Sequence, residues 1–138
     1  MARKFYVDTA IWRDYFEDRS DGMRPLGDLA FQFLKICRKK KYVVLISDEV
    51  ANELLRFYVQ SRVDEIFSNF RDIIVHIEIS KEQFSEAHSL WLKKHSGFPF
   101  SDVMHSILAR DNCATIISRD RHFAEIGIAD CLLPEEAD

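Results

Sequence analysis

Short apolar runs of strand length recur along the chain, separated by longer polar and mixed segments. The first run, from Phe5 to Val7, consists of β-forming residues and stops at Asp8. The run 42–46 (YVVLI) is apolar at every position, as expected for a strand that is covered on both faces. The strands that this pattern predicts are 5–7, 42–46, 72–79, 115–117 and 130–133.

Between these runs, apolar residues recur at steps of three and four, which is the period of an amphipathic helix. Serines stand where several helices would begin, at Ser47, at Ser101 and at Ser80, which has Gln83 three residues later as in a capping box. The predicted helices are 11–16, 26–40, 48–59, 63–70, 80–94, 102–111 and 121–125. This alternation indicates an α/β fold with a mainly parallel central sheet of about four to five strands flanked by helices. We expect a single domain over residues 1–138.

Composition narrows the class of protein. The 138 residues are 47% hydrophobic and 30% charged, proportions typical of a soluble globular protein. The three cysteines are widely separated and lack the spacing of a zinc ribbon, so we expect buried thiols in a cytoplasmic protein. The apolar runs are too short to cross a bilayer, and we expect no membrane partner.

Two acids follow predicted strands. Asp8 directly ends the first strand, and Asp120 comes three residues after the strand 115–117. Functional groups of a parallel sheet collect at the carboxyl ends of its strands, so both carboxylates could meet at that edge. Each acid also has a simpler explanation, because Asp8 could cap the helix that begins near Ile11 and Asp120 could anchor a turn.

Two further acids lie on predicted helices. Glu53 lies beside the apolar stripe of its helix, with Asp48 as an alternative, and Asp102 lies in the first turn of the helix that follows Ser101. Glu53 could equally be a solvated surface residue, and Asp102 could serve only the helix dipole. Four carboxylates at one edge would repel one another unless a cation is bound. An all-oxygen site favours magnesium or manganese over zinc.

Four segments together resemble one protein family. They are FYVDTAIW from Phe5, SDEVANELL from Ser47, FSDVMHSILA from Phe100 and TIISRDRHF from Thr115. In this order and spacing they are similar to the PIN-domain ribonucleases, a family that includes the toxins of many toxin–antitoxin pairs. The resemblance covers the chain from Phe5 to about Leu133 and implies a three-layer PIN-like sandwich. It also implies cleavage of single-stranded RNA by a water activated by Mg²⁺ or Mn²⁺.

The resemblance implies a role for each acid. The catalytic carboxylates would be Asp8, Glu53, Asp102 and Asp120. The metal ligands among them would be Asp8, Asp102 and Asp120. The hydroxyls of Thr9 and Ser118 would support this group. His122 departs from the family pattern, because many members carry a further acid at that position, so a fifth acidic ligand is not expected.

Nucleic acid requires positive charge around such a negative centre. The candidates for phosphate contacts are Arg13, Lys93, Arg119 and Arg121. The formal net charge of −4 equals the charge of the four site acids, so the remainder of the chain is nearly neutral. The resemblance also allows protein partners, a second copy of the chain and an antitoxin. A surface for either could include the aromatic residues Phe57, Tyr58, Phe67 and Phe70.

Four other classes of protein share some of these sequence features. A haloacid-dehalogenase phosphatase requires a second aspartate two residues after Asp8, where this chain has Ala10. A phosphoacceptor receiver domain requires an aspartate at the end of the third strand, where Glu78 and Ser80 stand. A zinc enzyme is disfavoured because the histidines lack HExxH spacing, and His105 is expected to be a packed residue with its polar atoms satisfied. The remaining alternative is a non-catalytic module that binds nucleic acid or protein.

Overall fold

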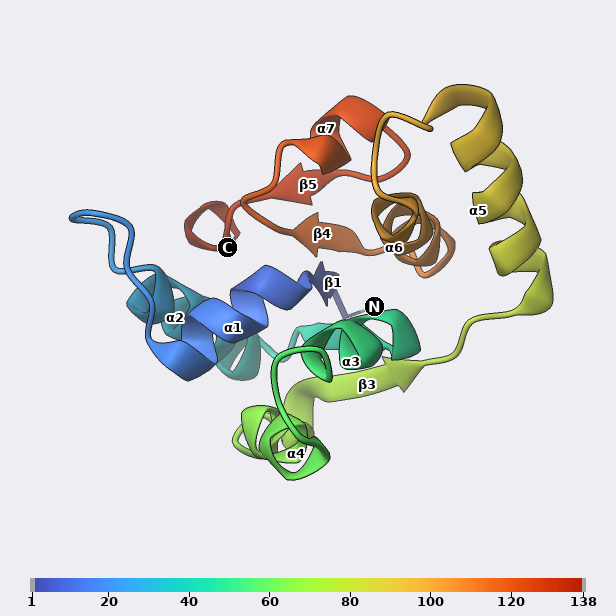
Figure 1. Cartoon of the computed structure of the whole chain (residues 1–138). Coiled ribbons are helices and arrows are strands. Elements are labelled where there is room, and N and C mark those ends of the chain that lie inside the picture. The colour runs from blue at the N-terminus through green and yellow to red at the C-terminus, as the bar shows by residue number, and fades with distance from the viewer. Residues whose placement is uncertain (1, 138) are drawn as a thin grey trace.

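The computed structural model describes residues 2–137, and a sheet of five parallel strands forms its centre. The strands are β1 (Lys4–Val7), β2 (Val43–Ser47), β3 (Ile74–Ile77), β4 (Thr115–Ile117) and β5 (Cys131–Leu132). Their order in the sheet is β3-β2-β1-β4-β5, which places β1 in the middle (Figure 1). The predicted α/β fold with a parallel sheet is therefore confirmed.

Helices cover both faces of this sheet. They are α1 (Thr9–Glu17), α2 (Leu26–Lys40), α3 (Asp48–Leu54), α4 (Gln60–Ser68), α5 (Lys81–Lys94), α6 (Phe100–Asp111) and α7 (His122–Ile126), with short 3₁₀ turns at Arg71–Ile73 and Pro134–Glu136. The helices α1 and α2 lie on one side of the sheet, and α5 and α6 lie on the other (Figure 1). Within residues 2–137, no helix has the length and apolar character needed to cross a membrane.

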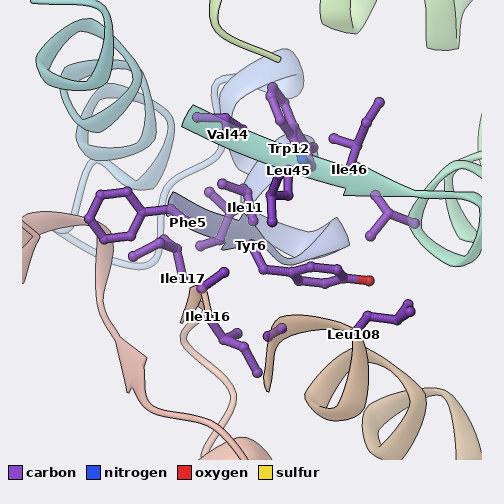
Figure 2. Close-up of a cluster of buried hydrophobic side chains, with 14 of the residues drawn as sticks. Phe5, Tyr6, Ile11, Trp12, Val44, Leu45, Ile46, Leu108, Ile116 and Ile117 are labelled. Atoms are coloured by element: carbon purple, nitrogen blue, oxygen red, sulfur yellow. The ribbon is translucent and has the colours of Figure 1, made fainter. Parts of the chain in front are cut away.

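The side chains of β1 form the middle of the hydrophobic core. Phe5 pairs in register with Val44 of β2 and with Thr115 of β4, so β1 has a hydrogen-bonded neighbour on each edge. The apolar sequence of β1 follows from this position, because the strand is buried on both faces. Figure 2 shows side chains of β1, β2 and β4 packed together with Ile11 and Trp12 of α1.

The strand order reverses beside β1. The chain proceeds from β1 outward to β2 and β3, and then returns to place β4 on the other edge of β1. The backbone of Asp8 continues the pairing, since its amide donates to the carbonyl of Ile117 over 3.0 Å. The residues after β1 and after β4 therefore meet at one edge, the place where parallel α/β sheets carry their sites.

Several predicted boundaries were wrong. The helix α3 ends at Leu54, five residues before the predicted end at 59, because the amides of Phe57 and Tyr58 both turn back to the Leu54 carbonyl. The strand β3 begins at residue 74 and not at 72. Asp72 lies in a 3₁₀ turn, where Arg38 of α2 binds its carboxylate over 2.7 and 2.9 Å.

Two of the three predicted serine caps are confirmed. The hydroxyl of Ser47 accepts a hydrogen bond in the first turn of α3, and Ser80 and Gln83 form the capping box of α5. Ser101 does not cap α6, because that helix begins two residues earlier than predicted, at Phe100 after Pro99. The missing cap follows from the proline, which fixes the backbone before the first turn.

The predicted aromatic surface is only partly exposed. Phe67 is buried against Trp12, with ring centroids 5.0 Å apart, and Phe70 is buried against Tyr15, with centroids 5.5 Å apart. The expectation that these two phenylalanines contribute to a partner surface was therefore wrong. Phe57 remains exposed, because α3 ends before it and leaves it in the following turn.

Candidate active site at the carboxyl edge of the sheet

One pocket at this edge contains all four acids selected from the sequence. It has a volume of about 230 Å³ and is lined by Asp8, Thr9, Ala10, Arg13, Glu53, Phe57, Asp102 and Asp120. Asp8 follows β1 and Asp120 follows β4, while Glu53 and Asp102 reach the pocket from α3 and α6. The alternative acid Asp48 does not line the pocket and instead pairs with His76 over 2.8 Å.

Asp8 both caps a helix and lines the pocket. Its Oδ1 accepts a hydrogen bond from the Thr9 amide at the start of α1, and its Oδ2 accepts one from the Ser118 hydroxyl, each over 2.8 Å. Burial raises the pKa of Asp8 to about 6, although His105 and the Ser118 bond act in the opposite direction. The two sequence-based interpretations of Asp8, a cap and a site residue, are thus compatible.

Ser118 connects the two strand-end acids. Its hydroxyl donates to Asp8 and also accepts a hydrogen bond of 3.0 Å from the Asp120 amide. Asp120 in turn accepts from the amide of His122 over 2.9 Å, which starts α7. The loop after β4 is therefore fixed to the end of β1 by side-chain bonds as well as by the sheet.

Glu53 is held by two donors on the same oxygen. The Thr9 hydroxyl donates to Oε1 over 3.0 Å, and Nε2 of His105 donates to it over 2.5 Å. Burial tends to raise the pKa of Glu53, but the bond and charge of His105, with the Thr9 bond, outweigh it and hold the pKa below its usual value. Glu53 therefore remains an anion at neutral pH.

A buried polar chain extends from Glu53 into the core. The other ring nitrogen of His105, Nδ1, lies 2.6 Å from the Tyr6 hydroxyl, which lies 2.6 Å from the Ser47 hydroxyl. All three side chains are buried, and the Tyr6 ring extends toward α6 (Figure 2). His105 is packed and satisfied as the sequence analysis expected, but its contact with Glu53 was missed. The sequence feature that could have indicated this contact is the position of His105 on the buried face of its helix, because a buried imidazole requires polar partners.

Asp102, Asp120 and His122 form a compact group of possible metal ligands. One ligand atom from each lies within 4.8 Å of the others. Nδ1 of His122 is 3.0 Å from Asp102 Oδ2 and 3.4 Å from Asp120 Oδ1. Burial raises the pKa of Asp102, and the bond to Asp102 raises the pKa of His122. Two carboxylates and an imidazole this close fit a divalent cation, which would relieve the repulsion between the acids.

His122 was not selected as a site residue from the sequence. It was noted there only as a departure from the acid that many PIN-domain members carry. The sequence feature that could have identified His122 as a site residue is its position two residues after Asp120, at the start of a short helix. The imidazole also stacks edge-on against Phe98, with ring centroids 5.2 Å apart, so its plane is fixed from a second direction.

The four cations selected for phosphate contacts are placed differently. Arg13 lines the pocket. The side chain of Arg119 is only 15% exposed and forms a two-pronged ion pair with Glu135, over 2.8 and 3.0 Å. Arg121 and Lys93 are exposed to solvent, and neither lines the pocket. Only Arg13 of this set is brought together with the acids.

Comparisons with solved structures identify the fold. The chain is similar to VapBC2 from Rickettsia felis bound to a DNA fragment from its promoter, with a TM-score of 0.71 and 14% identity over 94% of this chain and 98% of that one. It is also similar to VapC20 from Mycobacterium tuberculosis, described as a toxin that cleaves the sarcin–ricin loop (TM-score 0.65, 18% identity, 89% and 95% of the two chains). A third similar structure is FitAcB from Neisseria gonorrhoeae (TM-score 0.61, 12% identity, 96% and 99%). No protein-family model and no curated protein matches the sequence. The chain therefore has the PIN-like α/β fold of these structures.

Proposed function

We propose that this chain is a divalent-metal-dependent endoribonuclease that cleaves single-stranded RNA. The observation that carries the proposal is the convergence of four carboxylates, Asp8, Glu53, Asp102 and Asp120, on one pocket where the strand order of a PIN-like sheet reverses. The likeness to VapC20, which is described as a toxin that cleaves the sarcin–ricin loop, supports it.

The proposal assigns the charged groups of the pocket to separate tasks. Asp8, Asp102 and Asp120 would hold Mg²⁺ or Mn²⁺, with His122 beside them. Such an ion, when bound, lowers the pKa of a water molecule and stabilises charge on a phosphate. Glu53 is the acid suited to orient a water, because its lowered pKa keeps it ionised and two donors fix its Oε1.

The biological part of the proposal is a toxin role with protein partners. We infer a homodimer and an antitoxin, as the resemblance to PIN-domain toxins implies. The thiols Cys37, Cys113 and Cys131 are free, which suits the reducing cytoplasm that we propose as its location. Light scattering during size exclusion would test the dimer directly, since a monomer at micromolar concentration would contradict it.

The decisive experiment is cleavage of end-labelled single-stranded RNA and DNA by purified protein with magnesium, manganese or EDTA. Asp8→Asn and Asp120→Asn should abolish cutting while circular dichroism shows an unchanged fold. Asp64→Asn is the matched control, because Asp64 is an exposed acid on α4 outside the pocket. Cutting that persists in both pocket variants would overturn the site assignment. A folded, metal-binding protein that cuts nothing would favour the alternative of a non-catalytic binding module.

A further inference from the structure

Phe57 and Arg13 form a stacked pair at the rim of the acid-lined pocket. The guanidinium carbon of Arg13 lies 3.7 Å from the centroid of the Phe57 ring. Both residues line the same pocket as the four acids. Phe57 is 54% exposed in spite of this contact, so the ring has surface left to bind a further group.

Neighbouring side chains fix the plane of Arg13. Its Nε donates to Glu17 Oε2 over 3.2 Å and to the Tyr58 hydroxyl over 3.5 Å. Tyr58 also donates to Glu17, which closes a small network beneath the guanidinium. Because these bonds and the Phe57 contact restrain the group, little side-chain entropy remains to be lost when a ligand stacks on it.

The charges around the pair limit what can bind there. Among the described residues that line the pocket, Arg13 is the one cation, and the other charged members are carboxylates. A further carboxylate from a ligand would therefore meet repulsion from these acids. A nucleobase is neutral and flat, and bases of single strands stack on aromatic rings and on arginine planes.

We propose that Phe57 and Arg13 form a subsite that binds one nucleobase of a single-stranded nucleic acid. The proposal rests on the proposed nuclease function, because it uses the same pocket and places the base beside the phosphate that the acids would address. Stacking tolerates any base, so the subsite recognises an unpaired nucleotide and not a particular sequence. A duplex, whose bases are already stacked on one another, would not use it.

The test is equilibrium binding of a fluorescein-labelled single-stranded RNA, followed by fluorescence anisotropy in EDTA and again in calcium. A gel after each titration verifies that the strand is intact. Stacking of one base contributes roughly 5- to 150-fold in affinity, so Phe57→Ala should weaken binding by at least fivefold. Phe57→Trp should retain the affinity, because the indole provides an equal or larger stacking surface.

Phe84→Ala provides the matched control. Phe84 is 55% exposed, nearly the same as Phe57, but it lies on α5 and does not line the pocket. This variant should bind RNA as the wild type does. Equal losses in the two variants would show a general effect of removing surface phenylalanine and would overturn the subsite.

An abasic strand separates base binding from backbone binding. On a strand of abasic nucleotides, wild type and Phe57→Ala should differ by less than twofold. Unchanged RNA binding by Phe57→Ala overturns the subsite. Failure of the nuclease proposal is distinguishable, because protein that binds bases but never cuts with metal retains the subsite and loses only the catalytic assignment.

Discussion

Replacing Tyr6 by phenylalanine removes a single oxygen atom from the buried polar chain of Ser47, Tyr6, His105, Glu53 and Thr9. The ring itself, which fills the core between the sheet and α6, would stay in place (Figure 2). The hydroxyl makes two hydrogen bonds of 2.6 Å, one to Ser47 and one to Nδ1 of His105. Burial raises the pKa of Tyr6 far above its ordinary value, so the group is a neutral hydroxyl at every relevant pH.

The loss of the Tyr6 hydroxyl costs different amounts of stabilising free energy at Ser47 and at His105. The Ser47 hydroxyl still accepts a hydrogen bond of 3.3 Å from the Val50 amide. Removal of its bond to Tyr6 should therefore cost about 1 kcal/mol, the usual net contribution of one hydrogen bond. Nδ1 of His105 is left without a partner at a site that water does not reach, which costs about 1–2 kcal/mol. We therefore expect Tyr6→Phe to lower the free energy of unfolding by about 2–3 kcal/mol, or the Tm by about 8 °C.

Urea unfolding followed by the fluorescence of the two tryptophans, of which Trp12 is fully buried and Trp91 is partly buried, would measure this change. The matched control is Tyr42→Phe, because the Tyr42 hydroxyl makes no hydrogen bond within residues 2–137, and a change below about 0.5 kcal/mol is expected. A double-mutant cycle with Ser47→Ala should give a coupling of at least about 0.5 kcal/mol. Strict additivity, or a loss below about 0.5 kcal/mol for Tyr6→Phe, would refute the buried chain as a stabilising network.

Three further predictions follow from other parts of the molecule. The pKa of Asp8, about 6 in the folded protein, exceeds its ordinary value of 3.8, so its protonated form stabilises the fold at low pH and that stability is lost as the pH rises through 6. We therefore expect the free energy of unfolding of Asp8→Asn, relative to that of the wild type, to rise by about 2 kcal/mol from pH 4 to pH 8 in urea titrations with EDTA. A difference between the two proteins that stays constant with pH would contradict this. Gly27→Ala should cost about 2–3 kcal/mol, because its Cβ would lie 2.5 Å from the Asp18 backbone, while Gly97→Ala, with nothing within 4 Å, should change the Tm little. Arg119→Ala should lower the Tm but leave RNA affinity unchanged in anisotropy titrations, because its guanidinium pairs with Glu135. Arg13→Ala should lower RNA affinity and change the Tm little, because Arg13 lines the pocket.

The sequence was informative wherever a local pattern determines the structure. The apolar runs identified the strands around β1, and the position of Asp8 and Asp120 after β1 and β4 predicted where they would meet. A parallel sheet makes that inference possible, since all its strands present their carboxyl ends at one edge. Glu53 was selected because it lies beside the apolar stripe of a helix predicted to end at 59, and its side chain lines the pocket although α3 ends at Leu54.

Contacts between distant segments left no comparable local signal. His105 meets Glu53 across 52 positions of sequence, and His122 meets Asp102 across 20. A helical period says which face of α6 is buried, but not which acid will face the histidine there. The position of Arg119 beside Asp120 predicts a phosphate contact, but in the folded chain its guanidinium is bound by Glu135.

The donors around the four acids indicate how the chain tolerates so much negative charge. Serine, threonine and histidine side chains hold the carboxylates of Asp8, Glu53 and Asp102, and no lysine or arginine is bonded to them among residues 2–137. Hydroxyl groups fix the direction of a carboxylate without neutralising it, whereas His105 and His122, whose pKa values are raised by their bonds to Glu53 and Asp102, offset part of the negative charge when protonated. An arginine bonded to these acids would stabilise the metal-free fold but would occupy the place of a divalent metal ion. Burial raises the pKa values of Asp8 and Asp102, so a divalent ion that binds there would compete with protons for these two carboxylates.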